Sequence, residues 1–173
     1  MMKRNILLFA SIGILFTTIG AYFGAKQLEP ETPGTRAITH LFAQSLPDPQ
    51  GKIQNMSQWK GKTLIVNFWA PWCAPCVEEM PELSALQAEV AKKNTQIIGI
   101  GIDSPSNILA FSAKYKIAYP LYIAGMSGTE LPRAFGNQGG LPFTVIIGPD
   151  EQVKKTYLGR LKLDEVRRDL AAF

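Results

Sequence analysis

The stretch FWAPWCAPC, from Phe68 to Cys76, contains both cysteines of a chain of 173 residues. Cys73 and Cys76 can therefore form a short ring with each other, bond to another molecule, or stay free, but they cannot form a disulfide across the fold. Tetrahedral zinc would need two more donors, and the only histidine, His40, is distant in the sequence. Cu(I), which thiolates favour, would also lack further ligands. We therefore expect no metal site and favour a redox pair.

The residues around the cysteines indicate how such a pair would work. TLIVNFW, residues 63–69, is typical of a strand that is covered on both faces, and a helical pattern runs from Ala74 to about Lys92. Cys73 would lie at the start of this helix, where free N–H groups and the helix dipole stabilise a thiolate. Cys76, one turn further on, could then resolve a mixed disulfide formed by Cys73.

The rest of the chain alternates between strand and helix patterns, which predicts an α/β fold with parallel strand pairs. A lead-in with a single helical turn near residues 56–59 precedes them. We expect strands at 96–103 and 119–125, a helix at 105–116, a hairpin at 142–159 around a Gly-Pro-Asp turn, and a final helix at 161–173.

The first 26 residues predict a transmembrane anchor. Ile6 to Ala25 contains no charge, and 20 helical residues span about 30 Å, the thickness of a bilayer core. The alternative, a cleaved signal peptide, fits poorly because Ile19 and Phe23 are large where small residues are required. Lys3 and Arg4 would hold the N-terminus in the cytoplasm, so the rest of the chain would lie on the periplasmic, extracytoplasmic side of the membrane. Disulfides persist in that compartment.

Two further expectations concern the exported part. Residues 27–45 are predicted to be a linker, because KQLEPETPGTR, residues 26–36, has the composition of an extended tether, and the folded domain is expected over 46–173. Lys and Arg number 18 against 14 Asp and Glu, and two of the basic residues precede the apolar run. This balance gives no reason to expect a nucleic-acid partner.

The motif Trp69-Ala70-x-Trp72-Cys73-x-Pro75-Cys76 after a buried strand resembles the thioredoxin-fold active site. Pro81 matches the family's helix proline, and Leu141-Pro142 stands where thioredoxin folds have a cis-proline. The resemblance covers roughly residues 46–173 and favours the TlpA/ResA-like, DsbE-related branch of membrane-anchored thiol-disulfide oxidoreductases. It implies a thioredoxin-like α/β fold, a central mixed sheet flanked by helices.

The resemblance also implies roles for particular residues. Cys73 and Cys76 would be catalytic, and Trp72, Leu141 and Pro142 would contact the substrate chain.

A third catalytic residue is implied on the same helix. Asn67 stands where cytosolic thioredoxins carry a buried aspartate. Glu79 stands where ResA-type members have a functional glutamate, three residues after the second cysteine. The alternative for Glu79 is an ordinary solvent-exposed glutamate, as we expect for Glu78 and Glu82.

We therefore expect a membrane-anchored, extracytoplasmic protein-disulfide reductase without a cofactor. Its partners would be disulfide-containing exported proteins, such as apocytochrome c in cytochrome c maturation or copper-centre assembly proteins, and a transmembrane electron donor of the DsbD/CcdA type. A disulfide oxidase or isomerase of the same fold and a copper-handling or partner-binding thiol module stay open as alternatives. A peroxidase is disfavoured because the Thr-x-x-Cys pattern is absent around Cys73.

Overall fold

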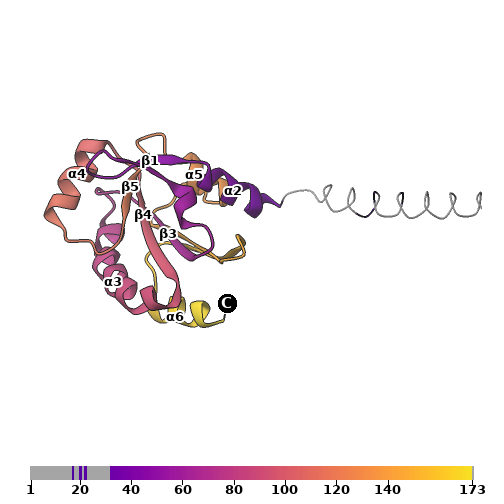
Figure 1. Cartoon of the computed structure of the whole chain (residues 1–173). Coiled ribbons are helices and arrows are strands. Elements are labelled where there is room, and N and C mark those ends of the chain that lie inside the picture. Colours follow the sequence, from indigo (N-terminus) through magenta and orange to yellow (C-terminus); the bar gives the residue numbers. More distant parts are fainter. Residues whose placement is uncertain (1–16, 18–19, 21, 23–31, 173) are drawn as a thin grey trace, which may run out of the picture. The chain divides into compact units, whose positions relative to one another are not determined.

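A computed structural model of the chain describes residues 32–172 together with Thr17, Gly20 and Tyr22. Figure 1 presents the arrangement of the elements. The predicted anchor over residues 1–26 lies outside the described residues, apart from those three. Among the described residues, no helix has the length and apolar character needed to cross a membrane.

A five-stranded mixed sheet forms the centre of the fold, in the order β5-β4-β3-β6-β7. β3 lies in the middle, parallel to β4 and antiparallel to β6, and all its residues after Thr63 are buried, as its composition predicts. β7 is an edge strand, which suits its adjacent Lys154 and Lys155. The strands are β3 (Thr63–Trp69), β4 (Thr95–Gly101), β5 (Leu121–Ile123), β6 (Phe143–Ile147) and β7 (Val153–Leu158).

Helices cover both faces of this sheet. One face packs against α3 (Ala74–Val90), α4 (Pro105–Lys114) and α6 (Leu163–Ala171). The other packs against α2 (Pro33–Phe42), the single turn Met56–Trp59 and α5 (Glu130–Ala134). α2 and α5 lie beside each other, away from α3 and α6 (Figure 1). A short turn, Ala91–Lys93, follows α3, and β1 (Ser45–Pro47) pairs with β2 (Ile53–Asn55) in a separate hairpin.

The predicted thioredoxin-like architecture is confirmed, and the expected strands and helices lie within about two residues of their predicted ends. The linker prediction for residues 27–45 is wrong over Pro33–Phe42, which form α2. Thr32 caps this helix by accepting a hydrogen bond from the Thr35 N–H at 3.2 Å, and Pro33 occupies its first turn. Ala37, Ile38 and Leu41 are buried, so packing against the sheet stabilises a segment whose composition suggested a tether.

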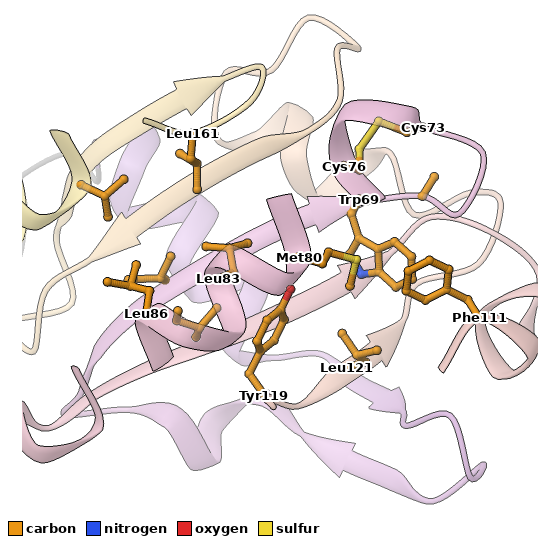
Figure 2. Packing of buried hydrophobic residues seen from close by; sticks show 14 of the residues in the cluster. Trp69, Cys73, Cys76, Met80, Leu83, Leu86, Phe111, Tyr119, Leu121 and Leu161 are labelled. Atoms are coloured by element: carbon orange, nitrogen blue, oxygen red, sulfur yellow. A yellow bond between two sulfur atoms is a disulfide. The ribbon is translucent and has the colours of Figure 1, made fainter. Parts of the chain in front are cut away.

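The core beneath the cysteines is tightly packed and aromatic. Figure 2 shows it, with the two sulfur atoms at one end of the cluster. The ring centroids of Trp69 and Phe111 lie 4.6 Å apart, and Met80 and Leu83 of α3 are completely buried. α3 is thus held against the sheet through its length, which places its first turn at the end of β3.

Leu83 and Leu109 give a matched test of this packing. Leu83 is completely buried in α3, whereas Leu109 in α4 is 49% exposed. We expect Leu83→Ala to lower the free energy of unfolding by about 3 kcal/mol because it leaves a cavity. Leu109→Ala should change it by less than about 0.5 kcal/mol. Urea denaturation of the oxidised variants measures both values, and equal losses would contradict the packing described here.

Candidate active site

Cys73 and Cys76 are joined by a disulfide with an Sγ–Sγ distance of 2.07 Å. Cys73 is the N-cap residue of α3, and Cys76 lies in the first turn of the helix. Cys73 keeps 7% of its surface exposed, whereas Cys76 is completely buried. Of the two cysteines, only Cys73 is therefore accessible to a partner protein.

The start of α3 favours negative charge at Cys73. The first N–H groups of a helix lack intrahelical acceptors and carry the positive end of its dipole. Pro75 has no N–H to leave unsatisfied in this turn, and the Cys73 carbonyl already accepts the first helical hydrogen bond, from Val77 N–H at 3.1 Å. The cap position thus stabilises a thiolate at Cys73.

Glu79 lies one turn after Cys76 and is completely buried, so the solvent-exposed alternative is wrong. Its Oε1 accepts a hydrogen bond from Asn67 Nδ2 at 2.7 Å, and its Oε2 accepts one from the Leu161 N–H at 3.0 Å. Asn67 Nδ2 also donates to Thr144 Oγ1, at 3.1 Å, on the neighbouring strand. The amide at position 67 therefore binds a carboxylate that the helix supplies.

The surroundings of Glu79 keep its pKa near 7. Burial is the largest influence and raises the pKa of Glu79 to about 7 from an ordinary value of 4.5. The hydrogen bonds from Leu161 and Asn67 and the charge of Arg160 act in the opposite direction, because they stabilise the ionised form. A carboxyl group with a pKa near 7 can both accept and release a proton at physiological pH.

Glu78 is exposed, as predicted, whereas Glu82 is only partly exposed, and each forms an ion pair with Arg160. His40 lies on an exposed part of α2. No group of three or more His, Cys, Asp or Glu side chains lies close enough to hold a metal ion in the part of the chain that the structure describes.

The residues expected to contact substrate come from two separate segments. The Leu141-Pro142 peptide bond is cis, as the resemblance implies. Trp72 is 67% exposed, and it lines a cavity of about 80 Å³ together with Leu141, Ile102 and Pro132. Pro142 is buried and does not line this cavity. The structure thus brings Trp72 and Leu141 together, whereas Pro142 is buried next to Leu141 in the chain.

Three contributors to the site were missed at the sequence level. The Leu161 N–H and the Thr144 hydroxyl have no local signal, since they lie 82 and 77 residues from the side chains they contact. Asn137 shapes the loop before the cis-proline, because its Oδ1 accepts from the Gly139 and Gly140 N–H groups at 3.0 and 3.1 Å. An asparagine shortly before two glycines is a turn signal that could have indicated this role.

The raised pKa of Glu79 makes stability depend on pH. Below about pH 4.5 the carboxyl is protonated in both the folded and the unfolded chain. As pH rises to about 7, the unfolded chain loses this proton first, so the free energy of unfolding should fall by about 3 kcal/mol. Glu79→Gln removes this contribution, so its stability relative to the unmodified protein should rise by that amount between pH 4.5 and pH 8. Urea titrations of both oxidised proteins measure the difference, and a constant value across the range would contradict the raised pKa.

Comparison with known proteins agrees with this geometry. The chain matches the AhpC/TSA family over residues 39–158. It is 30% identical over 169 residues to a thiol-disulfide oxidoreductase ResA from Bacillus cereus, with 91% of each chain covered. A ResA from Geobacillus thermodenitrificans is 28% identical over 126 residues, covering 72% of this chain and 71% of the relative.

Solved structures give the same result. A thiol:disulfide interchange protein of the thioredoxin family from Chlorobium tepidum is 27% identical and superposes with a TM-score of 0.64, covering 75% of this chain and 91% of that one. The chain belongs to the AhpC/TSA family, as a thioredoxin-fold thiol-disulfide oxidoreductase of the ResA type.

Proposed function

We propose that the protein reduces disulfides of exported proteins, with Cys73 as the attacking residue and Cys76 as the resolving residue. The observation that carries this proposal is the difference between the two cysteines. Cys73 caps α3 and reaches the surface, whereas Cys76 is completely buried, one turn from Glu79. Attack on a partner belongs to the accessible sulfur, and the second sulfur needs to reach only the first.

The reaction transfers two electrons from the reduced cysteine pair to the partner. The Cys73 thiolate attacks one sulfur of the partner disulfide, that S–S bond breaks, and the departing partner thiolate takes a proton from solvent. The Cys76 thiol then loses its proton, and its thiolate attacks Cys73 Sγ. The mixed disulfide breaks, the partner leaves with both thiols reduced, and the Cys73–Cys76 disulfide seen in this structure is the product.

Glu79 is the proposed proton acceptor for Cys76. Cys76 is buried, so water has little access to its thiol. The Glu79 carboxyl lies one turn along the same helix and has a pKa of about 7, which suits it to receive the thiol proton near neutral pH. Asn67 holds the ionised carboxylate through a 2.7 Å hydrogen bond. Glu79 would therefore accept the proton that, in cytosolic thioredoxins, a buried aspartate at the position of Asn67 accepts.

Trp72, Leu141 and Pro142 form the proposed substrate platform. The exposed Trp72 ring and Leu141 line a cavity that, at about 80 Å³, is far smaller than the roughly 300–1,000 Å³ of small-molecule sites. A space of this size suits one side chain of a bound peptide, so the platform fits a protein substrate. The buried Pro142 would hold the backbone of Leu141 through their cis peptide bond.

The cellular setting is proposed from the first residues of the chain. An uncharged run from Ile6 to Ala25, preceded by Lys3 and Arg4, supports a single-pass anchor in the cytoplasmic membrane with the catalytic domain outside. A reductant there needs electrons from a transmembrane donor of the DsbD/CcdA type. Its substrates would be exported disulfide proteins, with apocytochrome c and copper-centre assembly proteins as candidates.

The reduction potential tests the proposed direction. The proline before the second cysteine resembles that of reducing members of the fold, so we expect a potential near the thioredoxin value of about −270 mV. Equilibration with dithiothreitol or glutathione buffers, followed by the fluorescence of the tryptophans near the disulfide, measures it. A potential near that of DsbA, about −120 mV, would instead make the protein an oxidant.

Trapping tests the assignment of the two cysteines. Cys76→Ser removes the resolving thiol, so its Cys73 should accumulate as a mixed disulfide with reducible substrates such as insulin and with exported proteins in cells. Mass spectrometry identifies the adducts. Cys73→Ser is the matched control and should form at least about tenfold less adduct, because Cys76 is buried. Equal trapping by both variants would overturn the assignment.

A further inference from the structure

The segment from Gly159 to Lys162, which joins β7 to α6, contacts two separate parts of the site. Its Leu161 N–H donates to Glu79 Oε2 at 3.0 Å. Its Gly159 N–H donates to the Pro142 carbonyl at 2.8 Å. Gly159 has a φ of 87°, a backbone conformation that glycine adopts without strain. This one segment therefore donates hydrogen bonds to both the buried carboxylate and the cis-proline, so a shift of the segment would alter both contacts.

Arg160 fastens the segment to α3. Its Nη1 lies 3.1 Å from Glu78 Oε2, and its Nη2 lies 2.8 Å from Glu82 Oε1. Glu78 and Glu82 are four residues apart and so lie on one face of the helix, one turn from each other. The planar guanidinium spans that turn, and Glu79 is buried beside it.

We propose that Arg160 is a positioning residue for the thiol-disulfide reaction, because it holds the Gly159–Lys162 segment against α3 and thereby keeps the Leu161 N–H on the Glu79 carboxylate. This inference rests on the proposed function of Glu79 as the proton acceptor of Cys76. The ion-pair partners of Arg160 among residues 32–172 are Glu78 and Glu82, so it acts on the reaction through the position of the Leu161 N–H on Glu79.

The groups that surround Glu79 determine in which direction the loss of Arg160 shifts the pKa of Glu79. The charged groups that act on it are Glu82 of α3 and Arg160 of the β7–α6 segment. Tyr119, before β5, also interacts with it, and burial raises the pKa of this phenol, so the phenol stays neutral. β3 contributes the uncharged Asn67, which is itself hydrogen-bonded to Thr144 of β6. The charge of Arg160 lowers the pKa of Glu79, and that of Glu82 raises it.

Removing the guanidinium should therefore raise the pKa of Glu79 for three separate reasons. Its own charge is lost, Glu82 is left unneutralised, and the Leu161 N–H is less firmly held on the carboxylate. Each change disfavours the ionised form of Glu79. The ion pairs of Arg160 are themselves about half exposed, and exposed pairs add little to stability, so the consequence should be visible in the titration of Glu79 rather than in folding.

The test is a titration of Glu79 by carboxyl ¹³C NMR in the oxidised full-length protein, with its resonance assigned by its absence in Glu79→Gln. In Arg160→Gln we expect the pKa to rise by about half a pH unit, a roughly threefold change in the ionisation constant. Arg160→Lys keeps the charge but loses the planar guanidinium that binds both glutamates at once. Its Glu79 pKa should therefore lie between those of the unmodified protein and Arg160→Gln. If Arg160→Gln does not fold, Arg160→Lys alone still decides, because the loss of the planar guanidinium should leave the pKa of Glu79 above its value in the unmodified protein.

Arg167 supplies a matched control. Like Arg160, it pairs with two carboxylates and connects to α3: its partners are Glu89 of α3 and Asp164 of its own helix, α6, each at 2.9 Å. Among the interactions of residues 32–172, none connects Arg167 to Glu79 or to the Gly159–Lys162 segment. Arg167→Gln should leave the pKa of Glu79 unchanged.

A Glu79 pKa in Arg160→Gln equal to that of the unmodified protein, or a rise shared equally by Arg167→Gln, would overturn the role of Arg160. The pH profile of insulin reduction adds an independent measurement, and its Glu79-dependent limb should move to higher pH in Arg160→Gln only. If the unmodified protein does not reduce insulin, the proposed function fails, but the NMR titration still decides whether Arg160 controls Glu79.

Discussion

The burial of one carboxyl group behind the disulfide is the constraint on which this site depends. A carboxylate without water is costly unless hydrogen bonds replace its hydration, and Glu79 receives two, from Asn67 and from the Leu161 N–H. These bonds only partly offset the burial, so the pKa of Glu79 remains raised to about 7. The protein thus keeps, beside a buried thiol, a group that can change its protonation near neutral pH.

The fold meets this constraint by joining segments that are far apart in the sequence. β3 supplies the neutral Asn67 amide, which binds the carboxylate without adding a second charge and also donates a hydrogen bond to the Thr144 hydroxyl of β6. The β7–α6 segment supplies a backbone N–H, which cannot titrate. Among residues 32–172, the positive charge that acts on the carboxyl is that of Arg160, which pairs with Glu78 and Glu82 on α3. The charged partner therefore lies at the surface, and inside the protein Glu79 is bound by neutral hydrogen-bond donors.

The elements around the site and the helix α2 differ in how well the sequence predicted them. The strand before the cysteines, the helix after them and the cis-proline were all predicted, because hydrophobic periodicity, helix-start chemistry and a specific motif lie within short windows. α2 was missed because Pro, Thr and Gly form the cap and first turn of a helix as readily as they form a tether. What makes Pro33–Phe42 a helix is the burial of Ala37, Ile38 and Leu41 against the sheet, which composition does not reveal.

The sequence by itself determined the thioredoxin-like fold, the pairing of Cys73 with Cys76 and the candidacy of Glu79, since each follows from spacing along a strand, a helix or a known motif. The tertiary structure alone decided that Glu79 is buried rather than solvated, that Asn67 binds it, and that the Leu161 N–H reaches it from 82 residues away while Arg160 pairs with the neighbouring Glu78. The reason is physical: proton affinity depends on the solvent and dipoles around a group, and those are set by segments that meet only when the chain folds.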